Sequence, residues 1–191
     1  MKTLRNIIIA VALLMFGTPQ LADAQQVSLS TNLLTWANFG TTNLDAAVSV
    51  SKNFTVHAGA KYNPWEFRTK SQVTILNQQI TGYVGAKYWP WHVYSEWWVG
   101  AKFQYKNFEQ VGLLSPNLRR GDAVGGGLAG GYTFLVGRNF NVDVGLGLWG
   151  GRLLRYREYE GNVAVDSKLI DIGPRNFMFL DNVMIALVYI F

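Results

Sequence analysis

The sequence predicts an all-β fold: an eight-stranded antiparallel up-and-down β-barrel that spans a membrane. Apolar residues recur at every second position in eight segments. Aromatic and aliphatic side chains gather on one face of these segments, and glycine, alanine and charged residues gather on the other. An apolar exterior around a polar interior is typical of a transmembrane barrel. A soluble barrel that binds a ligand inside sorts its residues the other way.

The composition agrees with one folded domain. A chain of 191 residues suffices for one domain, or for two small ones. An apolar content of 49% excludes disorder, and only 15% of the residues are charged, against about a quarter in soluble proteins. The absence of cysteine excludes a disulfide scaffold and a thiolate metal site. The net charge of +5 is spread too thinly to indicate a nucleic-acid partner.

The beginning of the chain is set apart from the barrel. Lys2 and Arg5 precede a short apolar run, which is followed by a small-residue cleavage pattern that ends at Ala24. This order is typical of a secretory signal peptide, here residues 1–24. The apolar run is too short for a membrane-spanning helix, which needs about 20 residues. We therefore expect residues 25–191 to form the mature barrel domain, outside the cytoplasm.

The strands follow from a period of two along the chain. In residues 43–50 every even-numbered residue is apolar, and the same alternation recurs to the end of the sequence. Segments of 9 to 11 residues are long enough to cross a bilayer at a tilt. The expected strands cover residues 28–37, 43–50, 54–62, 78–89, 95–106, 123–136, 140–149 and 181–191.

The connections between these segments alternate in length. Outer-membrane barrels have short periplasmic turns and longer outer loops. An even number of strands also places both mature termini in the periplasm. We expect turns at residues 51–53, 90–94 and 137–139, a short first outer loop at 38–41, and long outer loops at 64–77, 107–121 and 150–180. The spacing therefore predicts an outer-membrane location.

A repeated motif predicts charges inside the barrel. The order glycine, alanine, lysine, aromatic residue occurs at 59–62, 85–88 and 100–103. In each copy the lysine shares the inward face with glycine, and the alternation turns three carboxylates inward as well. Buried charges are expected to pair. The predicted lumen network is Asp45, Lys61, Lys87, Glu96, Lys102 and Asp143. A narrow gated ion path is the alternative interpretation, although eight strands leave room only for side chains.

Catalysis finds little support in the sequence. The two histidines are His57, expected as a polar lumen residue, and His92, expected in a periplasmic turn. Neither has neighbours that indicate a metal site or a nucleophile. The glycine-rich stretch at 125–127 lacks the lysine and serine of a phosphate loop. We expect no enzyme, no metal and no cofactor; an envelope lipid-modifying enzyme remains a remote alternative.

Two sets of residues are candidates for surface contacts. An aromatic girdle at the membrane interface is expected from Trp89, Trp91, Tyr94 and Trp97. Contacts from the long outer loop to lipopolysaccharide phosphates or a surface partner are expected from Arg152, Arg155 and Arg157. A run of charges is, however, also typical of a solvated surface.

The last strand carries the most specific signal. Apolar residues occupy alternate positions up to the terminal phenylalanine, as in the signature by which assembly machinery recognises outer-membrane barrels. Its physical basis is an edge strand that can pair. The residues of this assembly signal are Val183, Ile185, Leu187, Tyr189 and Phe191.

Three short motifs carry a resemblance to a known family. They are Thr31-Asn32-Leu33-Leu34, Tyr62-Asn63-Pro64-Trp65 and Val188-Tyr189-Ile190-Phe191. With them, nearly the whole mature chain resembles a domain-of-unknown-function family of small outer-membrane barrels from Bacteroidota. The resemblance implies fold and location, but no activity, because none is established for the family. Some relatives are encoded beside fimbrial adhesin genes.

Together these observations predict a non-enzymatic outer-membrane barrel. It is expected to act as a structural anchor, an accessory subunit or a surface-binding protein through its outer loops. The expected partners are outer-membrane lipid and lipopolysaccharide, the barrel assembly machinery during insertion, and a surface lipoprotein or fimbrial component. A small gated pore or transport element is the alternative function.

Overall fold

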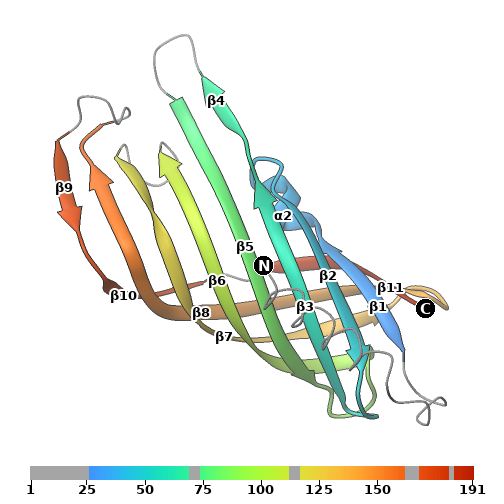
Figure 1. Cartoon of the computed structure of the whole chain (residues 1–191). Helices are drawn as coiled ribbons and strands as arrows, with labels where there is room; N and C mark the ends of the chain where they lie inside the picture. The colour runs from blue at the N-terminus through green and yellow to red at the C-terminus, as the bar shows by residue number, and fades with distance from the viewer. Residues whose placement is uncertain (1–25, 69–73, 112–116, 162–167, 181–182) are drawn as a thin grey trace, which may run out of the picture.

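The structure is a computed structural model that describes residues 26–68, 74–111, 117–161, 168–180 and 183–191. The predicted signal peptide lies outside these residues. The predicted all-β fold is confirmed as an eight-stranded antiparallel barrel, because the strands close on one another (Figure 1). No helix among the described residues is long and apolar enough to cross a membrane.

The barrel wall follows the order of the chain. The first seven strands of the wall are β1 (Val27–Asn32), β2 (Thr42–Ser49), β3 (Phe54–Asn63), β5 (Thr74–Tyr88), β6 (Glu96–Val111), β7 (Leu118–Leu135) and β8 (Phe140–Tyr159). The eighth consists of two pieces, β10 (Arg175–Leu180) and β11 (Met184–Ile190). Because β11 pairs with both β8 and β1, the barrel closes. Two short strands, β4 (Glu66–Arg68) and β9 (Leu169–Ile172), pair with the far ends of β5 and β8.

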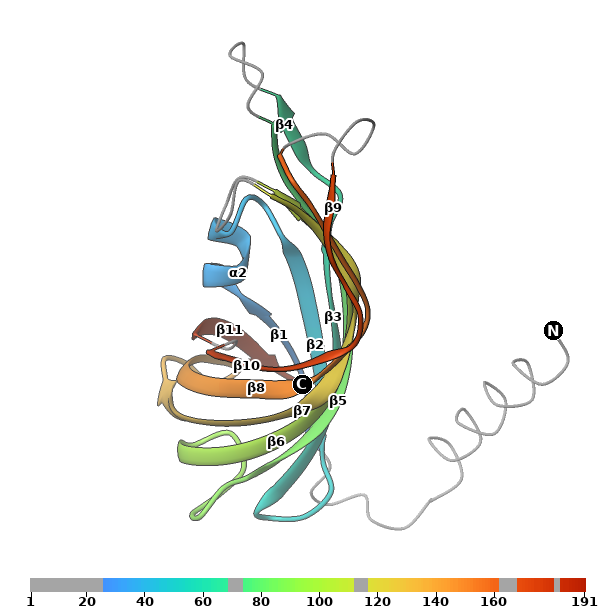
Figure 2. The same ribbon diagram turned by 90° about the vertical axis from the view of Figure 1, so that its left-hand side faces the viewer.

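The two ends of the barrel differ. One end, which we call the turn end, holds the tight turns after β2, β5 and β7; Val27 and Ile190 also lie there. At the other end β5 to β8 continue well past β1 and β2, and they form a tall wall that reaches β4 and β9 (Figure 2). Much of the predicted outer loops at 107–121 and 150–180 is therefore strand. Polar side chains on both faces hide the period of two there, while backbone pairing continues.

The first predicted strand is wrong in its second half. β1 ends at Asn32, and a short helix, α2 (Leu33–Ala37), follows. The side-chain oxygen of Asn32 accepts a hydrogen bond from the backbone N–H of Leu34 at 3.1 Å, so asparagine caps the helix. Leu33 and Leu34 are compatible with a strand or a helix, and the cap from Asn32 favours the helix.

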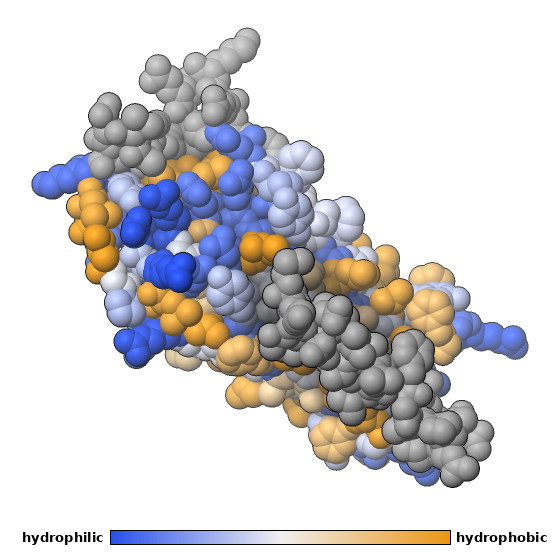
Figure 3. Space-filling model, in the orientation of Figure 1, coloured by the Kyte–Doolittle hydropathy of each residue, from blue (hydrophilic) through white to orange (hydrophobic). Residues whose placement is uncertain are grey.

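The outward face carries an apolar band around the barrel. Glycine and small residues alternate with large apolar side chains that point away from the lumen and are exposed. Members of this apolar band include Leu44, Val84, Val99, Phe103, Leu128, Leu146 and Leu148. On the face shown in Figure 3, hydrophilic residues gather toward the tall wall, and hydrophobic ones are more frequent lower down.

Candidate functional site

The lumen is closed at the turn end by four side chains, which we call the floor cluster. Trp89, Val93, Tyr94 and Trp98 are all buried there and pack against one another. The ring centroids of Trp89 and Trp98 lie 6.2 Å apart, and those of Trp89 and Tyr94 lie 5.7 Å apart. The floor cluster therefore places buried aromatic side chains inside the turn end of the barrel.

Hydrogen bonds to the wall hold the floor cluster in place. The indole N–H of Trp89 donates to the hydroxyl oxygen of Thr55 on β3 at 3.1 Å. The side-chain amide of Asn141 on β8 donates to the backbone carbonyl of Tyr94 at 2.8 Å. The connection after β5 therefore folds inward, beneath the lumen, instead of projecting away from it.

Because the connection folds inward, the predicted aromatic girdle is wrong for two of its four residues. Trp89 and Tyr94 were expected at a membrane interface, but both are buried in the floor cluster. Their polar atoms find partners inside, which an outward-directed turn would not offer. Trp91 and Trp97 are exposed, as a girdle requires.

A buried ion pair lies directly above the floor cluster. The Nζ atom of Lys87 is 3.2 Å from Oδ2 of Asp143, and the Thr133 hydroxyl donates to Oδ1 of the same carboxylate at 2.6 Å. The ammonium group also lies 4.1 Å from the centroid of the Trp98 ring, which adds a cation–π contact. Lys87 is thus bound on one side by charge and on the other by the floor cluster.

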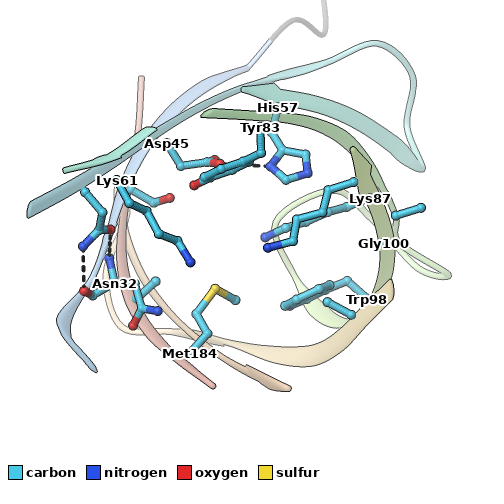
Figure 4. Close-up of a pocket in the computed structure, with 15 residues that line it drawn as sticks. Asn32, Asp45, His57, Lys61, Tyr83, Lys87, Trp98, Gly100 and Met184 are labelled. Carbon is cyan, nitrogen blue, oxygen red and sulfur yellow. Dashed lines mark hydrogen bonds and ion pairs between the residues drawn. The ribbon is translucent and has the colours of Figure 1, made fainter. Parts of the chain in front are cut away.

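A second polar pair lies on the adjoining strands β2 and β3. Nδ1 of His57 is 3.0 Å from Oδ2 of Asp45, and both side chains are largely buried. Nearby, Nζ of Lys102 lies 5.3 Å from the ring centroid of Tyr83. These groups surround a cavity of about 60 Å³, into which Lys61 also points (Figure 4). A space of this size holds a few water molecules.

The structure thus brings together five of the six residues of the predicted lumen network. Asp45, Lys61, Lys87 and Lys102 line the cavity, and Asp143 binds Lys87. Glu96 does not join them. It is exposed at the first residue of β6, where φ is +58° and the chain leaves the inward-folded turn. The alternation alone cannot reveal that the strand starts with a residue in this unusual conformation.

Three further lumen residues were not singled out from the sequence. Trp98, Tyr83 and Thr133 complete the contacts of Lys87, Lys102 and Asp143. The alternation does place Trp98 and Tyr83 on the same face as the lysines of their strands. What the sequence did not show is that aromatic rings lie inside a polar lumen.

A separate polar network lies on the tall wall, beyond the apolar band. The carboxylate of Glu158 accepts hydrogen bonds from the Tyr156 hydroxyl at 2.6 Å, from Arg119 at 3.0 Å and from Asn117 at 3.0 Å. These donors, the tyrosine first, lower the pKa of Glu158 to about 2. Burial and donation to Glu158 raise the pKa of Tyr156 to about 12. The network is therefore built around an ionised glutamate.

We expect Glu158→Gln to weaken the barrel at pH 7 by about 1–3 kcal/mol, because three donors lose a charged acceptor. The folded-state pKa of Glu158 lies below its ordinary value of 4.5, so its contribution is complete above pH 4.5 and is lost as the pH falls toward 2. Urea unfolding at several pH values, followed by tryptophan fluorescence, measures this. The exposed neighbour provides a control, since Glu160→Gln should change little. A stability difference that is as large at pH 2 as at pH 7 would argue against an ionised Glu158.

The three arginines expected in an outer loop lie on a strand. Arg152, Arg155 and Arg157 all belong to β8, and their side chains are exposed. Nε of Arg155 lies 3.9 Å from Oδ2 of Asp122, which is a weak surface contact. The predicted basic patch is therefore held on the rigid tall wall.

The residues of the predicted assembly signal share the outward face of the last strand. Val183 precedes β11, Ile185, Leu187 and Tyr189 lie on it, and Phe191 ends the chain; all are exposed. In the described part of the chain no cluster of three histidine, aspartate or glutamate side chains could hold a metal ion.

One family model matches the chain. It is described as Protein of unknown function (DUF3575), and the match covers residues 8–191. This agrees with the resemblance to a family of unknown function that three short motifs indicate. No curated protein and no solved structure matches.

Proposed function

The chain belongs to the DUF3575 family of proteins of unknown function, and from its own residues we propose that it is a sealed outer-membrane barrel that acts as an anchor and surface-binding subunit. The apolar band is the observation that carries this proposal. Large aliphatic and aromatic side chains are exposed around a barrel whose interior is polar. In water such a surface would cause aggregation. In a bilayer it is the surface that lipid requires.

The interior favours an anchor over a pore. The floor cluster occupies the turn end, and above it the ion pair of Lys87 and Asp143 and the charged groups of the wall leave only a small cavity of about 60 Å³. Eight-stranded barrels are narrow enough for side chains to fill. We therefore propose that the barrel does not conduct.

The tall wall is the part available to a partner. It continues past the apolar band and carries arginines on a rigid sheet. Rigid scaffolds that present binding residues at one end are a common arrangement in barrels. The proposed partner is a surface lipoprotein or fimbrial component, and lipopolysaccharide phosphates are the proposed ligands of Arg152, Arg155 and Arg157.

Gentle detergent extraction of a tagged chain from outer membranes tests the binding role. We expect a stoichiometric surface protein to co-purify with the barrel. A triple replacement of the three arginines on β8 by glutamine should reduce the lipopolysaccharide that co-purifies, while Lys52→Gln at the turn end serves as a matched control. Recovery of the barrel in another cell fraction would contradict the proposed location.

Conductance in planar bilayers tests the sealed lumen. The wild-type barrel is expected to leave the current at baseline, because the floor cluster excludes water. Discrete current steps that vanish in Lys102→Met would support the pore instead, since this lysine lines the cavity.

A further inference from the structure

Among the described residues, one strand of the barrel wall has a pairing neighbour on one side only. In a closed barrel every strand pairs on both sides. β11 does so, with β8 and β1, but in the described part of the chain its continuation β10 pairs with β8 alone. The backbone N–H and C=O groups along one edge of β10 are therefore available for pairing.

The neighbour is missing because β1 ends early, and Asn32 ends it. The Asn32 side chain donates to the carbonyl of Val183 at 3.2 Å and accepts from the N–H of Ile185 at 3.2 Å. The Asn32 side chain thus makes the last hydrogen bonds to the chain at the start of β11, at the point where β1 stops. The chain then leaves the wall as α2, on the side of the mouth opposite the tall wall (Figure 2). The edge of β10 stays open above this point.

Most of the open edge lacks the protection that edge strands normally carry. Charges, proline or bulges usually prevent an edge from pairing with another chain. Pro174 precedes β10 and Arg175 begins it, but from Asn176 to Leu180 the strand has none of these. Phe177 points inward and packs on Trp149, with ring centroids 4.5 Å apart, while Met178 on the opposite face is 75% exposed. Both faces of the edge are thus apolar.

An open edge on β10 is unfavourable because of where this strand lies relative to the proposed membrane. Leu180 lies opposite Leu148, a member of the apolar band, so this part of the edge lies at the upper border of the proposed membrane. Unpaired backbone groups in contact with hydrocarbon are strongly unfavourable, and open sheet edges are not tolerated there. The helix α2, whose Leu33 and Trp36 side chains are exposed, lies against β11, the strand that follows β10.

We propose that the open edge of β10 receives an extended segment of a partner protein as an additional strand. This rests on the proposed role as a surface-binding subunit, and it names the contact. The segment pairs its backbone with β10, and its apolar side chains cover Met178 and the exposed residues of α2. Lipid cannot supply those backbone hydrogen bonds. Two copies of β10 would share a ladder roughly 20 Å long, far less contact than the roughly 1,200 Å² that stable dimers bury.

Hydrogen exchange on the purified mature barrel in detergent tests this proposal. The probe is a synthetic ten-residue peptide of alternating threonine and valine, and the matched control is the same peptide with alternate backbone nitrogens methylated. Without peptide, amides of β10 should exchange faster than those of residues 141–145 on β8, which pair with β11 on one side and β7 on the other. The unmodified peptide should remove most of this fast exchange in β10, and the methylated peptide should not.

Three outcomes would overturn the proposal. The first is slow exchange of β10 in the monomeric barrel alone. The second is equal protection by both peptides. The third is protection that rises with barrel concentration, together with disulfide dimers of Met178→Cys in this otherwise cysteine-free chain, which would assign the edge to a second copy. Cell fractionation tests the proposed outer-membrane location separately. The proposed pairing at β10 can therefore succeed or fail independently of the proposed location.

Discussion

Replacing Asp143 by alanine is expected to destabilise the barrel by about 3–5 kcal/mol, the cost of leaving a buried charge without its partner. Lys87 would lose its carboxylate at 3.2 Å and keep the faces of Trp98 and, at 5.6 Å, Trp89. The Thr133 hydroxyl would lose its acceptor as well. Urea unfolding in detergent micelles, followed by the fluorescence of the floor-cluster tryptophans, gives the change in the free energy of unfolding.

A double replacement separates the charge from the packing. Lys87→Met combined with Asp143→Leu removes both charges and keeps comparable volume, so it should recover much of the loss. The free energies of unfolding of this double variant, of Lys87→Met and of Asp143→Leu together give the coupling energy between the two side chains. If Asp143→Ala costs no more than the exposed control Glu96→Ala, the lumen pair does not stabilise the barrel.

Gly131→Val is expected to disrupt the barrel most strongly among the glycine positions beside the floor cluster. A Cβ atom at Gly131 would meet the carbonyl oxygen of Val144 on β8 and would lie 2.7 Å from Cζ2 of Trp98. Gly145, which pairs with Gly131, faces the same ring at 2.9 Å. Overpacking of this kind costs about 1–3 kcal/mol or more, because a backbone atom cannot move aside.

The heat-dependent shift of a folded barrel on a gel provides the measurement for Gly131→Val. The folded band should be lost or appear at a lower melting temperature. Gly82→Val is the control, since nothing lies within 4 Å of a Cβ atom at Gly82. Equal melting temperatures for the two variants would show that Trp98 does not pack on the paired glycines.

The strand pattern and the inward charges could be predicted because one rule governs both. A period of two assigns each residue to a face, and lysines at positions such as Lys87 are then inside wherever their strand is correct. The rule fails where the chain is not a simple strand. Trp89 and Tyr94 belong to a turn that folds inward, and Glu96 has a positive φ, and neither feature leaves a periodic trace.

The tall wall and the break after β1 were missed for a different reason. Beyond the apolar band both faces of β8 are polar or mixed, so the alternation that defines a strand disappears although pairing continues. At Asn32 a single side chain caps α2 and ends the ladder of β11. An asparagine side chain can both cap a helix and bond to a strand, but the sequence does not show that Asn32 does so, because this depends on how the barrel packs.

Electron paramagnetic resonance on single-cysteine variants in lipid vesicles tests the central claim most directly. Spin labels at Val99, Leu128 and Leu146 report on the apolar band, and a label at Arg155 reports on the tall wall. The account predicts that the first three collide with oxygen more readily than with a water-soluble nickel complex, and that the label at Arg155 does the reverse. Collisions with nickel as frequent at the apolar band as at the tall wall would show that the barrel does not span the membrane.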